Sequence, residues 1–356
     1  MEEKKTTSRR RTRKPAAKAK GAETAKATTG TKAVKTTKTA AKTTVRRKTT
    51  RQAAGSKRKT NANQPTVRII PLGGIGEVGK NMTVIEYEND IIVVDCGMTF
   101  PQSDMLGIDY VIPDVSYLAK NKDKIRGFLF THGHEDHIGA TPFILKDFKN
   151  VPIYGGRLTL ALIEHKMEEH RIKGIKSNVI KPGSKVKLGC FTITFLKVSH
   201  SIADAYALAI ETPVGTILHT GDFKVDYTPL DGEMMDLAAF ANLGRKGVQL
   251  LMSESTNSER PGYTMSEQRV AKSFDDLFAQ ATGRIFVATF ASNVSRIQQI
   301  IKIAESRGRK IYVAGRSLQR ITEIATEIGY LKIRKGTLLD DRQLDFVDPE
   351  QVVILT

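Results

Sequence analysis

The sequence has little cysteine and no long apolar run, and these absences limit the kind of protein it can be. Its two cysteines, Cys96 and Cys190, lie far apart and form no C-x-x-C pair. They predict small buried thiols in a reducing compartment, without chemistry of their own. No apolar run approaches the ~20 residues that span a bilayer, and nothing resembles a secretory signal. We therefore expect a soluble protein of the cytoplasm.

Residues 1–64 lack aromatic side chains and have few acidic ones. They hold 21 Lys and Arg against 3 Glu, a balance of +18 that equals the formal net charge of the whole chain. Subtracting these from the chain totals of 56 basic and 38 acidic residues leaves residues 65–356 neutral, with 35 of each. Repeats such as Lys-Thr-Thr-Lys-Thr-Ala-Ala-Lys cannot bury enough apolar surface to offset the entropy of ordering. The composition predicts a disordered basic tail.

Three interpretations of this tail are open. A flexible polycation would hold nucleic acid through phosphate contacts, with an affinity that falls as salt rises. A solubilising extension would have no specific partner. An organellar transit peptide would also be rich in Ser and Thr and poor in acids, although the Lys excess and the early Glu2 and Glu3 count against it. We favour the first, with nucleic-acid contacts at unspecified positions within residues 1–64.

Beyond the tail, the patterns predict two domains, at residues 65–260 and 261–356. In the first, two β-rich blocks with helices between them predict paired sheets faced by helices, an αββα sandwich. In the second, helices at 266–279, 295–306 and 318–328 alternate with apolar runs, which predicts a parallel α/β domain. The last run, 351–356, reads as a third parallel strand with no turn or helix after it. We therefore expect this domain to be incomplete.

A glycine-rich segment, Gly74-Ile-Gly-Glu-Val-Gly79, matches the dinucleotide fingerprint G-x-G-x-x-G. That fingerprint requires a helix next, followed by an acidic residue on a parallel strand. Another strand pattern follows here, so we interpret the match as fortuitous. The glycines are better explained by tight backbone turns beside a site.

The most informative stretch is residues 131–137, Thr-His-Gly-His-Glu-Asp-His, directly after an apolar strand pattern. In extended backbone, side chains two residues apart project to the same side, so His132 and His134 can converge on one ion. Asp136 and His137 follow where the chain turns toward a helix, and can face a second ion. Imidazoles with one carboxylate suit zinc better than magnesium or calcium. The spacing does not fit the helical H-E-x-x-H motif.

Two further segments place metal-capable residues at strand ends, Val198-Ser-His200 and Leu218-His-Thr-Gly-Asp222. Taken alone, a histidine there is typical of a hydrogen-bonded structural residue, and Gly-Asp is typical of a turn. Together with the upstream H-x-H-x-D-H motif they gain weight, because a closed metal site needs ligands from more than one loop. We therefore interpret both as ligands.

The order of Asp95, the H-x-H-x-D-H motif, His200 and Asp222 resembles that of the metallo-β-lactamase superfamily over about residues 65–225. Three more segments extend the resemblance to about residue 356: residues 73–81, Ser253-Glu-Ser-Thr-Asn257 and Thr289-Phe-Ala-Ser-Asn293. With them the chain is similar to the ribonuclease J family, of the β-CASP branch of nucleic-acid-processing enzymes. The implied fold is a metallo-β-lactamase αββα sandwich followed by the first part of a β-CASP domain.

The resemblance implies two metal ions, with Zn²⁺ as the expected metal and Mn²⁺ as the alternative. The implied ligands are His132, His134 and His200 for one ion, Asp136 and His137 for the other, and Asp222 as a bridge. Asp95 would support the ligand loop from behind, a strand-end turn being its alternative role. Glu254 would orient a ligand or help with proton transfer, and a Ser/Thr-rich turn is its alternative.

The implied activity is hydrolysis of RNA phosphodiester bonds by two-metal hydroxide attack, in 5′-to-3′ exonuclease and endonuclease modes. It would serve rRNA processing and mRNA decay, in a homodimer or homotetramer, with RNA-decay factors or the ribosome as partners. The alternatives are a hydrolase of small esters or thioesters and a non-catalytic RNA-binding protein. One departure stands out: no histidine follows His219, whereas the family places further histidines there, including a ligand of the second metal. Either the chain is a fragment or the second ion is under-coordinated.

Overall fold

The apolar runs expected to be strands do form strands, and these assemble into three sheets. The structure is a computed structural model that describes residues 65–229 and 232–356. The expectations for the tail, residues 1–64, lie outside the described residues. All described residues fall within one compact unit, Asn61–Thr356, and the domain boundary expected near residue 260 stays a prediction.

The first sheet begins with the antiparallel strands β1 to β3 and continues with parallel strands. Its order follows the sequence: β1 (Arg68–Gly73), β2 (Met82–Tyr87), β3 (Asp90–Val94), β4 (Ile125–Leu129), β5 (Ile153–Gly155) and β6 (Ser177–Val179). The expected hairpin around Glu88 and Asn89 is therefore confirmed.

The second sheet has the order β11-β10-β9-β8-β7 and is antiparallel except for the β10–β11 pair. Its strands are β7 (Lys185–Leu188), β8 (Phe191–Lys197), β9 (Tyr206–Thr212), β10 (Gly215–His219) and β11 (Leu250–Met252). Strand β11 was not predicted, because its three residues are too few for a periodic pattern.

Successive residues of the central strands enter two different cores, because side chains alternate across a strand. Val84 of β2 faces the helices and its neighbour Ile85 faces the second sheet. Strand β3 repeats this alternation with Val93 and Val94. The core between the sheets is completed from β8 to β10, with Phe195 fully buried in it.

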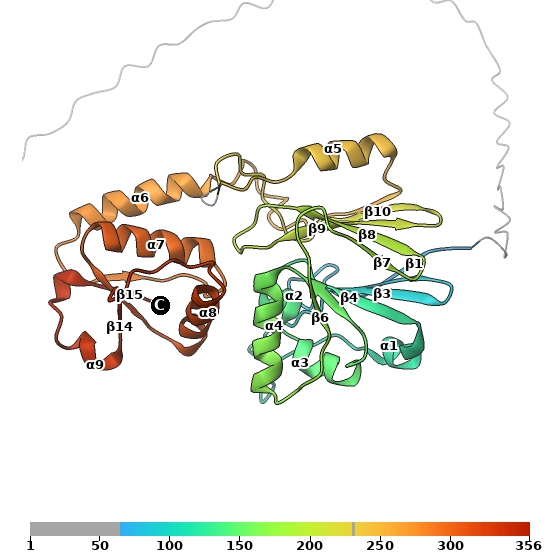
Figure 1. Cartoon of the computed structure of the whole chain (residues 1–356), viewed down its shortest axis with the longest axis horizontal. Coiled ribbons are helices and arrows are strands. Elements are labelled where there is room, and N and C mark those ends of the chain that lie inside the picture. Colours follow the sequence, from blue (N-terminus) through green and yellow to red (C-terminus); the bar gives the residue numbers. More distant parts are fainter. Residues whose placement is uncertain (1–64, 230–231) are drawn as a thin grey trace, which may run out of the picture. The chain divides into compact units, whose positions relative to one another are not determined.

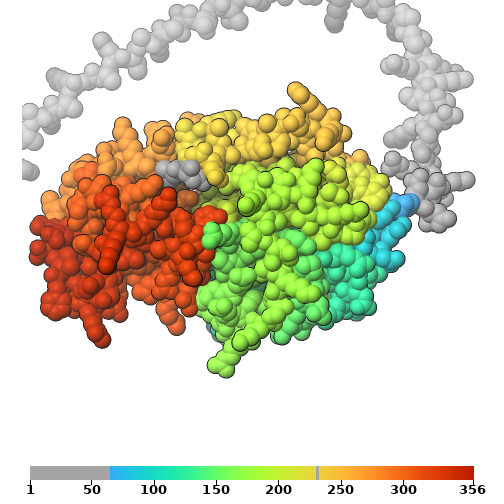
Figure 2. All heavy atoms as spheres, in the orientation of Figure 1, coloured from blue at the N-terminus to red at the C-terminus, as the bar shows by residue number. Residues whose placement is uncertain are grey.

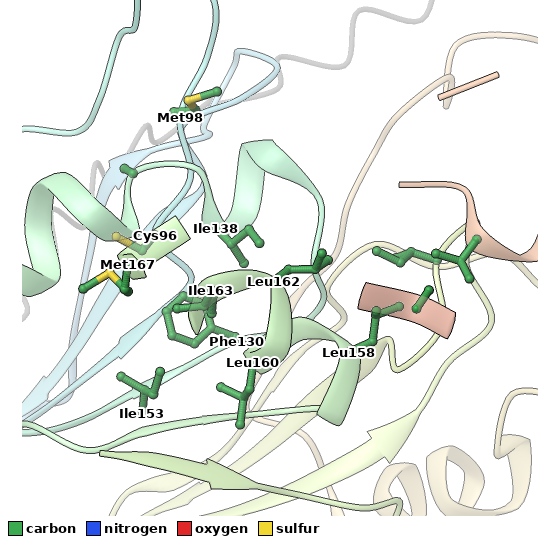
Figure 3. Packing of buried hydrophobic residues seen from close by; sticks show 14 of the residues in the cluster. Cys96, Met98, Phe130, Ile138, Ile153, Leu158, Leu160, Leu162, Ile163 and Met167 are labelled. Carbon is green, nitrogen blue, oxygen red and sulfur yellow. The ribbon is translucent and has the colours of Figure 1, made fainter. Parts of the chain in front are cut away.

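Helices cover the outer face of each sheet, as Figure 1 shows. The first sheet is covered by α1 (Ser116–Lys120), α2 (Glu135–Ile138), α3 (Thr141–Ile144) and α4 (Arg157–Glu169), with short 3-10 turns η1 (Lys122–Lys124) and η2 (Leu145–Asp147). Ile163 of α4 packs beside Phe130, at the end of β4 (Figure 3). On the second sheet, Phe240 of α5 (Leu237–Lys246) packs against a buried cluster that includes Ala207. The expected αββα sandwich is therefore confirmed.

The third sheet is parallel and has the order β12-β15-β13-β14. Its elements are β12 (Ile285–Val287), β13 (Lys310–Val313), β14 (Leu338–Leu339) and β15 (Val352–Leu355), with α6 (Glu267–Gln280), α7 (Val294–Ser306), α8 (Arg316–Glu327), α9 (Asp341–Leu344) and the 3-10 turn η3 (Pro349–Gln351). The expected alternation of helix and strand is confirmed. Strand β15, which was expected as a third parallel strand, is paired on both sides.

One helix prediction was wrong in its extent. The segment after the histidine motif, expected as one helix through about residue 148, is divided into α2, α3 and η2. Gly139 lies at the end of α2, and Pro142 lies in the first turn of α3, where its missing N–H is tolerated. No helix in the described part of the chain is long and apolar enough to cross a membrane.

Candidate metal centre

The H-x-H-x-D-H motif occupies the loop from the end of β4 into α2. His134 has extended backbone angles as the residue before α2, and Asp136 and His137 lie within that short helix. His132 and His137 are almost completely buried. The change from extended to helical backbone turns the first pair of side chains and the second pair toward different points, as expected from the spacing.

His132, His134, His200 and Asp222 form the first of two clusters. All of their nearest ligand atoms lie within 4.8 Å of one another. Nδ1 of His134 is 3.0 Å from Nε2 of His132 and 3.0 Å from Nε2 of His200. Three imidazole nitrogens thus face a common point, an arrangement that a cation accepting all three lone pairs would satisfy.

Asp136, His137 and Asp222 form the second cluster, with the same 4.8 Å limit. Nε2 of His137 is 3.5 Å from a carboxylate oxygen of Asp136 and 3.4 Å from Oδ1 of Asp222. The other oxygen of Asp222, Oδ2, is 3.8 Å from Nε2 of His200 and 4.0 Å from that of His132. Asp222 is therefore shared, with one oxygen toward each cluster.

Asp95 holds the motif from behind. Its buried carboxylate accepts hydrogen bonds from the backbone N–H and the hydroxyl of Thr131, each at 2.8 Å. Nδ1 of His137 donates to the same carboxylate at 2.8 Å. This leaves Nε2 of His137 to face Asp136 and Asp222, and it is the nitrogen that would bind a metal ion in place of a proton.

Asn81 is a contributor that the sequence analysis missed. Its backbone N–H donates to the carbonyl of Asp136 at 3.0 Å, and its side-chain amide donates to the same carbonyl at 3.1 Å. The amide also lies 3.1 Å from Nε2 of His137. Asn81 ends the glycine-rich segment, so the tight turns expected there do lie beside the candidate centre. A single asparagine after glycines carries no signal of such a contact.

The electrostatics of the two clusters differ. Burial and the neighbouring imidazoles lower the pKa of His200 to about 3, and burial lowers the pKa of His134 to about 4. Burial likewise lowers the pKa of His132 well below its ordinary value. These imidazoles are neutral at pH 7, as metal ligands must be.

His137 behaves in the opposite way. Although burial opposes it, the carboxylates of Asp95 and Asp222 raise the pKa of His137 well above its ordinary value. Burial also opposes ionisation of Asp222, but His137 holds the pKa of that carboxyl at about 2. The second cluster therefore favours a positive charge among its carboxylates, which a divalent cation would supply.

Glu254 lies on the wall of a cavity that begins at the centre. Its backbone N–H donates to the hydroxyl of Thr220 at 3.2 Å, and its carboxylate accepts from the N–H of Thr256 at 2.9 Å. The Ser/Thr-rich turn considered for this segment is thus present. A role of Glu254 toward a ligand or a proton stays a prediction.

The remaining histidines of the chain lie outside the two clusters. Nδ1 of His219 accepts a hydrogen bond from the N–H of Gly221 at 3.1 Å, so it supports the turn before Asp222. His165 pairs with Glu169 one turn further along α4. Both cysteines are free thiols, with Cys96 buried and Cys190 half-buried.

The cavity has a volume of about 1090 Å³, and His200, Asp222 and Glu254 are among the residues that line it. Its walls include two exposed aromatic side chains, Tyr227 (70% exposed) and Tyr263 (91% exposed). The space extends far beyond the two clusters, so the centre opens onto a groove that is larger than a small ester would need.

Comparison with known protein families assigns two parts of the chain. Residues 75–232 match the family model of the metallo-beta-lactamase superfamily, and residues 282–356 match that of the ribonuclease J beta-CASP domain. A crystal structure of a protein of unknown function from Enterococcus faecalis V583 is similar in fold, with a TM-score of 0.62 and 17% identity over 82% of this chain and 77% of that one.

Several curated proteins are similar in sequence. Ribonuclease J of Thermus thermophilus is 45% identical over 300 residues, which cover 82% of this chain and 52% of that protein. Ribonuclease J of Helicobacter pylori strain J99 is 44% identical, covering 84% of this chain and 43% of that protein. Ribonuclease J 1 of Streptococcus pyogenes is 44% identical, covering 81% and 51%. This chain thus spans about half the length of these relatives.

Proposed function

Because the chain belongs to the ribonuclease J family of the metallo-β-lactamase superfamily, we propose that it is a metal-dependent nuclease that hydrolyses phosphodiester bonds in RNA. The observation that carries the proposal is the placement of Asp222 between two groups of ligand atoms. Both groups include Asp222, and this sharing supports a two-ion centre over a lone structural site.

Each ion would have its own set of side chains. His132, His134 and His200 would hold the first, Asp136 and His137 the second, and Asp222 would bridge them. The imidazole-rich donor set favours Zn²⁺, and Mn²⁺ is compatible with the same ligands. Such an ion pair supplies a nucleophile from water at neutral pH and positive charge for the phosphate in the transition state.

The other residues of the centre would hold its ligands in place. Asp95 fixes the ring of His137 through Nδ1, and Asn81 fixes the backbone of Asp136. Glu254, on the cavity wall, would orient a ligand or pass a proton. Because these groups are buried or hydrogen-bonded before substrate arrives, little reorganisation is needed at the moment of reaction.

The groove supports a polymer as substrate. Exposed aromatic side chains such as Tyr227 and Tyr263 offer faces on which the bases of a single strand stack. We propose RNA as that polymer, cleaved in 5′-to-3′ exonuclease and endonuclease modes during rRNA processing and mRNA decay. A homo-oligomeric state, the RNA-decay or ribosomal partners and a cytoplasmic location remain predictions.

Replacing Asp222 tests this function. In Asp222→Ala both ions lose a shared ligand, so we expect kcat on a labelled single-stranded RNA to fall about 10³-fold or more. RNA binding should change by less than about threefold, because phosphate contacts elsewhere are retained. The matched control is Glu259→Ala, which removes an exposed carboxylate from the loop after Glu254.

The two readouts also separate the alternatives. A protein that only binds RNA would show no cleavage in the wild type and no change in either variant. A hydrolase of small esters would cleave such an ester and leave RNA intact. Full RNA cleavage by Asp222→Ala would contradict the proposed function.

A further inference from the structure

Two loops bring the distant ligands His200 and Asp222 to the candidate centre. Each continues directly into contacts with the α/β part of the chain, by which we mean the third sheet and helices α6 to α9. The loop between β8 and β9 carries His200 and, four residues later, Asp204, whose carboxylate accepts a hydrogen bond from Tyr330. The loop after β10 carries Asp222 and then Lys224, which pairs with Glu267 at the start of α6 at 3.4 Å. The H-x-H-x-D-H loop, in contrast, is held by Asp95 and Asn81 of the first sheet region.

Asp204 is held in an unusual conformation. Its φ of 59° places a non-glycine residue in the left-handed region, which persists where surrounding contacts determine it. One oxygen, Oδ2, accepts from the N–H of Leu158 in the first turn of α4 at 2.9 Å and from the hydroxyl of Tyr330 at 2.6 Å. The approach requires glycine at position 156, where a Cβ would lie 2.4 Å from that of Asp204.

Tyr330 is presented by the end of α8 and not by a free loop. Gly329 has a φ of 81°, and the N–H groups of Tyr330 and Leu331 both donate to the carbonyl of Ala325, at 2.7 and 2.9 Å. Leu331 is buried. Helix α8 packs against α4, and Figure 2 shows their segments side by side. The phenol is thus attached to the body of the third sheet and its helices.

A displacement of Asp204 would reach the ligands over a short distance. Ile202, between His200 and Asp204, is buried and lies against Gly133, the residue between His132 and His134. The two ligand loops are also joined to each other, because the N–H of Lys224 donates to the carbonyl of Ser199 at 2.7 Å. One hydrogen bond and a few packed residues therefore connect α8 to His200.

We propose that Tyr330 and Asp204 are positioning residues, which make the geometry of the metal centre depend on the position of the α/β part of the chain. The inference rests on the proposed metal site and goes beyond it, because it assigns to a residue 130 positions downstream of His200 a role in metal affinity. With the Tyr330 hydroxyl in place, the His200 loop is held in its ligating position. Without it, the loop samples other positions and the first ion is held less tightly.

The test compares two tyrosines. Tyr330→Phe removes the hydroxyl that bonds Asp204, and the control Tyr312→Phe removes a hydroxyl that bonds Asp341 at 2.8 Å within the third sheet region. Zn²⁺ affinity is measured by chelator competition on the full chain, and the Co²⁺ absorption spectrum reports ligand geometry. We expect Tyr330→Phe to weaken Zn²⁺ binding about three- to tenfold and to alter the spectrum, and Tyr312→Phe to change the affinity by less than about twofold.

A second variant separates geometry from charge. Asp204→Asn keeps an oxygen for both hydrogen bonds and tolerates the left-handed backbone, so it should bind Zn²⁺ almost as the wild type does. Equal affinities and spectra for Tyr330→Phe and Tyr312→Phe would overturn the inference while leaving the metal site intact. A wild-type chain that binds no Zn²⁺ would overturn the proposed function and this inference together.

Discussion

Asp95 shows how a residue contributes to a site without facing its centre. Its φ of 61° is unusual for aspartate, and its carboxylate serves Thr131 and His137 at once. The same residue orients the ring of His137, and its negative charge raises the pKa of that ring. Residues that hold metal-binding histidines from behind are often nearly as important as the ligands.

Asp95→Asn should therefore weaken metal binding without unfolding the protein. Loss of the charge behind His137 is expected to lower metal affinity about 10- to 100-fold, measured by chelator competition with elemental analysis of the bound metal. Asp90→Asn is the control, because Asp90 lies at the other end of β3 and its carboxylate likewise accepts hydrogen bonds, from Arg126 at 2.6 Å and from the N–H of Cys190 at 2.8 Å. Comparable metal affinities in the two variants would refute this role of Asp95.

At the scale of elements, the short helix α2 is seated by backbone contacts and not by its own length. A helix of four residues is not stable alone. The N–H of Cys96 donates to the carbonyl of His137 at 2.7 Å, and the N–H of Met98 donates to that of Glu135 at 3.2 Å. Between them, Gly97 leaves room for the backbone of Asp136, since a Cβ there would lie 1.6 Å from its carbonyl oxygen.

Gly97→Ala should displace α2 and with it two candidate ligands. We expect a loss of about 3 kcal/mol in the free energy of unfolding and reduced metal binding, measured by urea denaturation and metal titration. Gly244→Ala is the control, because Gly244 lies in α5 with open space around it. That change should stabilise the chain by about 0.5–1 kcal/mol. A Gly97→Ala protein with wild-type stability and metal content would show that α2 is seated by other contacts.

At the scale of the whole molecule, charge and chemistry are separated along the sequence. Residues 65–356 balance 35 basic with 35 acidic side chains, whereas residues 1–64 contain the net +18. The candidate centre lies in the neutral part and would hold the scissile phosphate locally. Long-range attraction of RNA would then depend mainly on the tail.

Deleting residues 1–64 should weaken RNA binding and flatten its dependence on salt. The slope of log affinity against log salt should become shallower by about 0.7 for each phosphate contact removed. We expect the loss of about two or more such contacts. Metal uptake should not change. A second variant keeps the length of the wild-type chain and replaces the eight Lys and Arg of residues 32–51 by Gln. This variant should show part of the loss of RNA affinity and of salt dependence. An unchanged slope in both variants would exclude phosphate contacts by the tail.

Much of the fold, and the grouping of the candidate ligands, could be predicted from the sequence because their signals are local. Apolar patterns predicted most strands of the first two sheets, with β6 and β11 as exceptions, and the spacing within residues 131–137 predicted two groups of candidate ligands. The contributions of Asn81 and Gly97 could not be predicted in this way. Both act through backbone atoms of Asp136, which lies about 40 or more positions away and leaves no periodic trace in the sequence.

The sequence by itself determined which side chains could bind metal, the order in which they occur and the uneven distribution of charge, because these depend on composition and spacing alone. Only the tertiary structure decided that Asn81 holds the backbone of Asp136, that β15 is an inner strand and that Tyr330 reaches Asp204. Such contacts join segments that are distant in the chain, and they form only when the sheets and helices bury their apolar faces together.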